Sequence, residues 1–281
     1  MEHAADMTLS AYYIASGYPP GHWTGRELAG LAGGRGIAGT VDGEGMNRLF
    51  GLGVDPVTGS PLGPNWRIPT PVEQRVATRA AALRADLDDA QRATAMAEIE
   101  AQERARRMPA PVSGFDLTFT LPKSASIVWA LADAATQTRI ASAHDEAVAD
   151  CLALIETHAL FTRTGHNGVA QVSTRGALAA CFAHWDTRLG DPNLHTHLVL
   201  ANKVQGEDGI WRAIDAKALY AAAVAISETY DTLVADKIAA TCGTTWRVRD
   251  RPDRSAAFDV DGISDVLLGE FSRRSRQVEA S

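Results

Sequence analysis

The stretch "HWDTRLGDPNLHTHLVLANKV", residues 184–204, holds three of the chain's 8 histidines: His184, His195 and His197. Its second half has the pattern of a β-strand, in which successive side chains point to opposite faces. His195 and His197 are two residues apart, so both imidazoles lie on the same face. The intervening "WDTRLGDPN" predicts a return of the chain, and hairpin pairing then places His184 beside the other two.

Three imidazoles on one face of a sheet are typical of a catalytic divalent-metal site with open coordination positions. A structural zinc site takes a fourth ligand, usually cysteine, but strand alternation places Cys181 on the opposite face from His184. A chance cluster of surface or core histidines is the alternative, and the shared face and hairpin spacing disfavour it. Imidazole suits several transition metals, so the spacing does not select the ion.

The composition limits the classes of protein to which the chain can belong. With 281 residues the chain is one large domain or two small ones. Its net charge of -7 argues against a protein wrapped everywhere by nucleic acid, although a local basic groove is compatible with it. Three widely separated cysteines indicate no disulfide framework. The sequence shows neither a signal-peptide pattern nor a membrane-length apolar run. We therefore expect a cytoplasmic protein without membrane insertion.

The order of expected elements predicts an α+β fold, a two-layer sandwich with an antiparallel central sheet and helices packed on it. Tyr18 follows Gly17 and precedes two prolines, which predicts a turn that need not face the sheet. The expected elements are a short helix at 8–17, a glycine- and proline-rich loop at 30–64, an exposed helix at 71–107, a strand at 114–122, helices at 124–135 and 141–159, strands at 168–174, 176–186 and 194–204, a short strand and a long helix within 210–240, strands at 244–251 and 256–260, and a basic helix at 264–280.

Four motifs resemble one family in order and spacing. "HWDTRLGDPNLHTHLVLAN" resembles the three-histidine motif of the conjugative relaxases of the TrwC/TraI (MobF) family, members of the HUH endonuclease superfamily. "GFDLTFTLPKSASIVWAL" resembles that family's aspartate-bearing strand, turn and helix. "YYIASGYPPGHWTGRELAGLAG" resembles its tyrosine-containing segment, and "FSRRSRQVEA" the start of its C-terminal region.

The resemblance implies an enzyme that nicks one DNA strand at a plasmid origin of transfer and forms a 5′-phosphotyrosyl intermediate in conjugation. Tyr12 and Tyr13 are then the nucleophile candidates, with Tyr12 first. Asp116 would orient a histidine ligand or help accept the phenol proton. A phenol with a pKa of about 10 is a poor nucleophile at neutral pH, and one divalent ion at the phosphate would stabilise the developing charge. Mg²⁺ or Mn²⁺ is expected, with Zn²⁺ as the alternative.

The implied partners are single-stranded origin DNA, relaxosome accessory proteins and the coupling protein of a type IV secretion system. Basic residues outside the histidine motif are expected to hold DNA phosphates. These candidates are Lys123, Arg247, Arg249, Arg273 and Arg274.

The N-terminal segment departs from the family pattern, in which a first strand and a first tyrosine pair come earlier. Only eleven residues precede Tyr12. We therefore expect a relaxase domain over residues 1–281 that lacks its first strand and its C-terminal DNA clamp, with an unpaired sheet edge and no helicase domain. Two alternatives stay open: a remnant that binds metal and single-stranded DNA without cleaving, and an HUH nuclease in which water replaces tyrosine.

Overall fold

The computed structural model describes residues 17–64, 70–106, 111–251, 254–273 and 277. Residues 8–16 of the expected N-terminal helix, including Tyr12 and Tyr13, lie outside the described residues, as does Arg274. The chain forms two compact units. The first contains Met1–Pro64 and Ser113–Ser281, and the second is Asn65–Val112.

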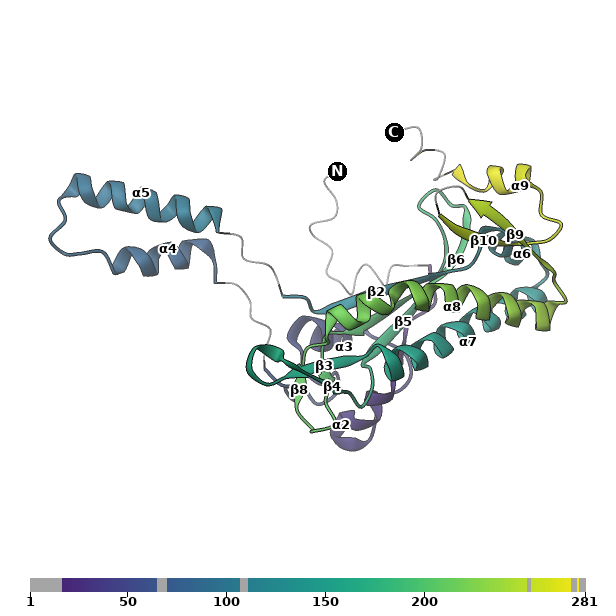
Figure 1. Cartoon of the computed structure of the whole chain (residues 1–281), viewed down its shortest axis with the longest axis horizontal. Helices are drawn as coiled ribbons and strands as arrows, with labels where there is room; N and C mark the ends of the chain where they lie inside the picture. Colours follow the sequence, from purple (N-terminus) through teal and green to yellow (C-terminus); the bar gives the residue numbers. More distant parts are fainter. Residues whose placement is uncertain (1–16, 65–69, 107–110, 252–253, 274–276, 278–281) are drawn as a thin grey trace. The chain divides into compact units, whose positions relative to one another are not determined.

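The first unit is built on an antiparallel sheet whose strand order among the described residues is β1-β5-β6-β2 (Figure 1). This confirms the expected α+β class. Three short antiparallel pairs, β3–β4, β7–β8 and β9–β10, accompany the sheet. The strands are β1 (His22–Thr24), β2 (Gly114–Thr120), β3 (Phe161–Thr164), β4 (Ala170–Ser173), β5 (Ala179–Asp186), β6 (Pro192–Ala201), β7 (Val204–Gln205), β8 (Trp211–Arg212), β9 (Trp246–Arg251) and β10 (Arg254–Val260).

Helices cover one face of this sheet. α7 and α8 lie side by side and bury the main core against alternate residues of β2 and β6 (Figure 1). Leu198 and Leu200 of β6 are fully buried there, and each fully buried leucine contributes about 1.5–3 kcal/mol. The Asp133 side chain caps the start of α7. The helices of this layer are α6 (Lys123–Leu131), α7 (Ala134–His158) and α8 (Ala216–Cys242), and α9 (Asp265–Glu270) contacts α6.

The opposite face carries a second core, which the sequence does not predict. Residues 30–64, expected to be a loop, instead include short helical turns, and Leu49 and Phe50 pack against Phe182 and Val199 of the sheet. The expectation was wrong because the glycines permit the bends while the apolar residues between them are buried; Gly53, for example, ends a turn at φ 70°. The turns are η1 (Arg26–Gly30), α2 (Leu31–Gly34), α3 (Gly43–Met46) and η2 (Asn47–Leu52).

This second core positions the candidate site. Alternate residues of a strand share a face, so the face that carries Phe182 of β5 and Val199 of β6 also carries the next alternate residues, His184 and His197. The apolar cluster includes Phe182 and Val199 but not the histidines. The histidines therefore lie at the end of a sheet face whose other half is packed.

The second unit contains a helical hairpin in place of the one helix expected over residues 71–107. Its helices are α4 (Val72–Ala81) and α5 (Asp89–Ala105). The prediction of one helix was wrong because Asp88 starts a new helix: its side chain accepts a hydrogen bond from the Gln91 N–H, and the Gln91 side chain accepts one from the Asp88 N–H. This reciprocal capping box is a strong helix start.

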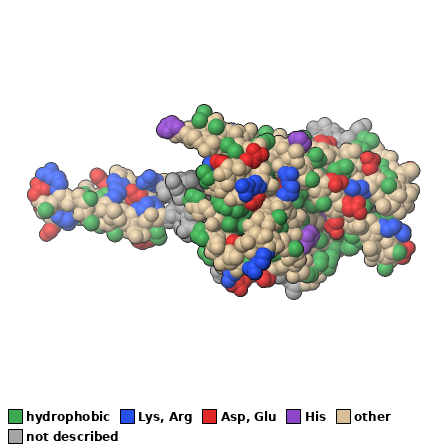
Figure 2. All heavy atoms as spheres, turned by 90° about the horizontal axis from the view of Figure 1, so that it is seen from below, with side chains coloured by type: hydrophobic (Ala, Val, Ile, Leu, Met, Phe, Trp, Pro, Cys, Tyr) green, Lys and Arg blue, Asp and Glu red, His purple; other side chains and the backbone are tan. Residues whose placement is uncertain are grey.

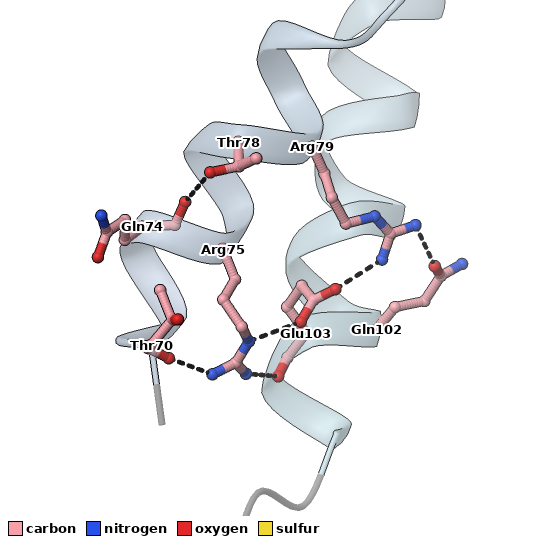
Figure 3. Close-up of polar contacts among 7 residues, drawn as sticks. All are labelled: Thr70, Gln74, Arg75, Thr78, Arg79, Gln102 and Glu103. Atoms are coloured by element: carbon pink, nitrogen blue, oxygen red, sulfur yellow. Dashed lines mark hydrogen bonds and ion pairs between the residues drawn. The ribbon is translucent and has the colours of Figure 1, made fainter. Parts of the chain in front are cut away.

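A buried carboxylate joins the two helices of this hairpin (Figure 3). The Glu103 side chain is 4% exposed and accepts from Arg75 Nε at 2.8 Å and from Arg79 Nη1 at 2.9 Å. These hydrogen bonds hold the pKa of Glu103 below its usual range. Arg75 also donates to the Glu103 carbonyl at 2.8 Å, so the contact fixes backbone as well as side chain.

Candidate metal centre

The hairpin of β5 and β6 brings the three histidines of the motif together. His184 and His195 are direct cross-strand partners, and His197 follows on the same face. The three ring centroids lie 5.1 to 5.3 Å apart, and one ligand atom from each residue lies within 4.8 Å of the others. This spacing allows one ion to bind all three imidazoles after small adjustments.

Hydrogen bonds orient two of the rings. The Nδ1–H of His197 donates to both carboxylate oxygens of Asp116, at 3.0 and 2.9 Å, and that of His195 donates to the Asn193 carbonyl at 2.7 Å. A proton on Nδ1 leaves the Nε2 lone pair as the metal ligand. Asp116 lies on β2, whose residue Thr118 pairs with His197. The donor set therefore fits a divalent ion.

The site is largely buried: His184 and His197 are 7% and 8% exposed. Burial is the main cause that lowers the pKa of His195 below its ordinary value, which favours the neutral form of this ring. A neutral ring binds metal, and because neutral ligands do not cancel the ion's charge, most of that charge stays available to an anionic substrate.

A buried network supports β6 from its opposite face. Thr196, between the two metal-facing histidines, exchanges a hydrogen bond of 2.8 Å with His144 Nε2 on α7. The other ring nitrogen of His144 lies 2.7 Å from the Tyr230 hydroxyl on α8. Burial lowers the pKa of His144 to about 3, so this ring is neutral at physiological pH. The sequence does not single out His144, because its partners come from distant segments.

Tyr18 lies in a turn, as expected, but its ring lies beside the metal histidines, a contact that the sequence did not require. Its ring stacks on His184 with centroids 4.2 Å apart, and its hydroxyl donates to Asp186. The physical reason is the edge strand β1, in which His22 pairs with Cys181 of β5. Continuing this antiparallel register brings Tyr18 level with Trp185. Recognising "HWT" as a strand would have predicted that Tyr18 lies near the end of β5, but not that its ring lies on the face of His184.

The loop between the histidine strands is held by residues expected to bind DNA. Asp191 is 1% exposed and accepts from the Arg273 backbone N–H at 2.9 Å and from its Nε at 2.7 Å. Arg273 also donates to the Leu189 carbonyl, and Lys123 donates to the Pro192 carbonyl at 2.8 Å. These two cations thus fix the β5–β6 connection beside the site.

The two expected phosphate-binding arginines of β9 also form ion pairs within the chain. Arg247 donates to the Asp265 carboxylate at 3.0 Å, and Arg249 pairs with buried Asp259 at 2.6 Å. Both side chains remain partly exposed, at 39% and 45%. On the face shown in Figure 2, basic and acidic side chains are interspersed. Phosphate binding by these residues stays a prediction.

The sequence matches the TrwC relaxase family over residues 1–281. The chain belongs to the TrwC relaxase family. Two relatives from Escherichia coli are multifunctional conjugation proteins TraI. One, from strain K12, is 31% identical over 185 residues, covering 59% of this chain and 10% of the relative. The other is 37% identical over 102 residues, covering 36% of this chain and 6% of the relative. The chain thus spans a small part of these relatives.

Solved TrwC relaxase structures share the fold. A copper-bound complex of TrwC with oriT DNA has a TM-score of 0.65 and 25% identity, covering 96% of this chain and 74% of that one. A metal-bound TrwC–oriT complex has a TM-score of 0.67 and 24% identity, with 96% and 77% coverage. In this chain, His184, His195 and His197 form a group that could hold a metal ion.

The predicted site residues that the structure describes thus divide into three groups. His184, His195, His197 and Asp116 form one contact set, while Lys123 and Arg273 lie at the loop beside it. Arg247 and Arg249 lie on β9, and the predicted nucleophiles lie outside the described residues. Within the described part of the chain, no helix is long and apolar enough to cross a membrane.

Proposed function

We propose that this chain nicks one strand of DNA at a plasmid origin of transfer by tyrosine transesterification. The observation that carries the proposal is the trio of converging imidazoles, two of them oriented by Nδ1 hydrogen bonds, in a chain of the TrwC relaxase family. The substrate is single-stranded origin DNA. Relaxosome accessory proteins and a type IV coupling protein are the partners that the family implies.

In the proposed reaction the Tyr12 hydroxyl oxygen attacks the scissile phosphorus, with Tyr13 as the second candidate. The bond from phosphorus to the 3′ oxygen breaks, the phenol proton is lost and the leaving 3′ oxygen is protonated. The products are a 5′-phosphotyrosyl link and a free 3′-OH, so the phosphodiester energy is conserved for rejoining.

His184, His195 and His197 would hold one divalent ion, Mg²⁺ or Mn²⁺, with Zn²⁺ as the alternative. Such an ion supplies charge stabilisation and alignment at the phosphate. Asp116 keeps the His197 proton on Nδ1, which maintains the ligand nitrogen on the metal side. His195→Ala is therefore expected to lower Mn²⁺ affinity about 10-fold or more. Calorimetry with unchanged affinity in this variant would contradict the assignment.

The decisive test uses labelled single-stranded DNA from the plasmid's own transfer origin with Mn²⁺ or Mg²⁺. The wild-type chain should form a covalent adduct, which peptide mapping should place at Tyr12. Tyr12→Phe removes the attacking hydroxyl and should abolish the adduct while leaving metal and DNA binding nearly unchanged. Tyr220→Phe is the matched control, because Tyr220 lies on α8 and is 67% exposed. DNA retained without cleavage would indicate a binding remnant, and cleavage without an adduct a water-dependent nuclease.

A further inference from the structure

We propose that Tyr18 is a positioning residue that holds the His184 imidazole and anchors the segment carrying the tyrosine nucleophile to β5. The proposal rests on the nicking function proposed above and assigns a role to a residue that sequence reasoning did not place at the site. Tyr18 makes two contacts there: its ring stacks on His184 at 4.2 Å between centroids, and its hydroxyl donates to Asp186.

The ring contact restricts a metal ligand. The Tyr18 ring stacks on His184. The rings of His195 and His197 lie 5.3 and 5.1 Å from the His184 ring, measured between centroids. The interplanar angle between Tyr18 and His184 is 30°, a nearly parallel stack. Aromatic stacking contributes enough to change an equilibrium about 3- to 10-fold. Tyr18 thus limits rotation of His184, whereas hydrogen bonds on Nδ1 orient the other two rings.

The backbone around Tyr18 is adapted to this position. Gly17 adopts φ 107°, which side chains of L-residues rarely permit, and Pro19 and Pro20 follow with fixed φ. Gly21 packs directly on β5, because an added Cβ would lie 2.3 Å from the Phe182 ring. The segment before β1 therefore contacts β5 at Tyr18 and at Gly21.

Chain connectivity links this anchor to the nucleophile. Tyr13 lies five residues before Tyr18 in the sequence. Because an extended residue spans at most about 3.6 Å, the Cα atoms of these two tyrosines are at most about 18 Å apart. Because Tyr18 is fixed beside His184, any approach of the Tyr12–Tyr13 pair to the metal histidines is through a chain tether that begins at Tyr18. The hydroxyl contact with Asp186 is the part of the anchor that does not act through the ring.

Two substitutions separate the contacts. Tyr18→Leu removes the stacked ring, and Tyr18→Phe keeps the ring but removes the hydrogen bond to Asp186. With Mn²⁺ alone in calorimetry, Tyr18→Leu should weaken binding about 3- to 10-fold, and Tyr18→Phe should remain within about 2-fold of wild type. In single-turnover adduct formation at saturating Mn²⁺ with the plasmid's transfer-origin strand, Tyr18→Phe should react about 10-fold more slowly.

Substitutions of Asp186 test the same hydrogen bond from its acceptor side. Asp186→Ala should slow adduct formation as Tyr18→Phe does, whereas Asp186→Asn keeps an acceptor oxygen and should restore most of the rate. Tyr220→Phe, on the exposed surface of α8, should match the wild type. Circular dichroism checks folding; if Tyr18→Leu does not fold, Tyr18→Phe and the Asp186 pair still decide the question.

Two results would overturn the proposal. In the first, Mn²⁺ affinity and adduct rate are unchanged in both Tyr18 variants. In the second, the wild-type adduct maps to Tyr18, which would make Tyr18 the nucleophile. If the wild-type chain forms no adduct, the nicking function itself fails, and the Mn²⁺ affinity of Tyr18→Leu still supports or refutes the role of Tyr18 in holding His184.

Discussion

Acidification should destabilise the metal-free protein through His144. This ring is 1% exposed and bonded on both nitrogens, to Thr196 and Tyr230. Burial lowers its pKa from the ordinary value of 6.5 to about 3. The folded state therefore keeps His144 neutral, whereas the unfolded chain takes up a proton as pH falls below 6.5. The stability that comes from keeping His144 neutral is fully present above pH 6.5 and is lost progressively as the pH falls toward 3.

The size of the effect follows from the two pKa values. Between about pH 7.5 and about pH 5, protonation of the unfolded chain at this one position should lower the free energy of unfolding by roughly 2 kcal/mol. A loss of that size is a large share of the stability of a typical domain, which is about 5–15 kcal/mol.

The assay is urea unfolding at these two pH values, followed by tryptophan fluorescence. Excess EDTA removes metal ions, whose binding to histidines is itself pH-dependent. His144→Gln cannot titrate, so it should lose about 2 kcal/mol less than the wild type on acidification, whatever its stability at about pH 7.5. His166→Gln, in an exposed turn, is the control and should behave as the wild type. If His144→Gln and the wild type lose the same amount, His144 is not the buried neutral group described here.

Three further outcomes are expected. Asp116→Asn should weaken Mn²⁺ binding in calorimetry about 10-fold or more, because His197 loses a charged acceptor, and an unchanged affinity would show that the contact is dispensable. Arg273→Ala should lower the free energy of unfolding by roughly 1–3 kcal/mol because buried Asp191 loses its hydrogen bond to the guanidinium and keeps the one to the backbone N–H; Arg188→Ala in the same loop is the control, and an equal effect of both would exclude a specific role. Affinity for single-stranded origin DNA should fall about 10-fold or more between about 50 and 200 mM salt, despite the acidic total charge, and a flat response in filter binding would argue against phosphate contacts.

The shared face of the three histidines could be predicted because it follows from local rules. Strand alternation placed His195 and His197 on one face, and a short return loop paired His184 with them. The same parity correctly placed Cys181 on the helix-covered face. These conclusions need no knowledge of distant segments.

Contacts between distant segments were harder to predict. The hydrogen bond between His144 and Tyr230 joins positions 86 residues apart, and the sequence pattern of neither helix indicates it. The irregular region before residue 64 was expected to be loop because its glycines dominate the pattern, yet Leu49 and Phe50 are buried. In that region, burial of apolar side chains in the folded chain determines the structure more than the local glycine pattern does.

Basic residues were the least reliable signal for a binding surface. An arginine in the sequence does not reveal whether its partner is a phosphate or a carboxylate of the same chain. Arg249 pairs with Asp259, and Arg273 with Asp191, and both carboxylates are 1% exposed. In a chain with more acidic than basic residues, such internal pairing is a common fate for a cation.

The two faces of β6 connect the metal centre to the helical layer. His195 and His197 face the metal side, and Thr196 between them faces the helices and bonds to His144. A slip of one residue in a strand exchanges its faces, so it would place Thr196 at the metal side and turn the histidines into the core. The bond between Thr196 and His144 opposes that slip from behind the sheet, while pairing with β2 and β5 opposes it within the sheet. The histidine geometry of this site therefore depends on packing between β6, α7 and α8, and damage to His144 should alter metal binding although His144 is not expected to be a metal ligand.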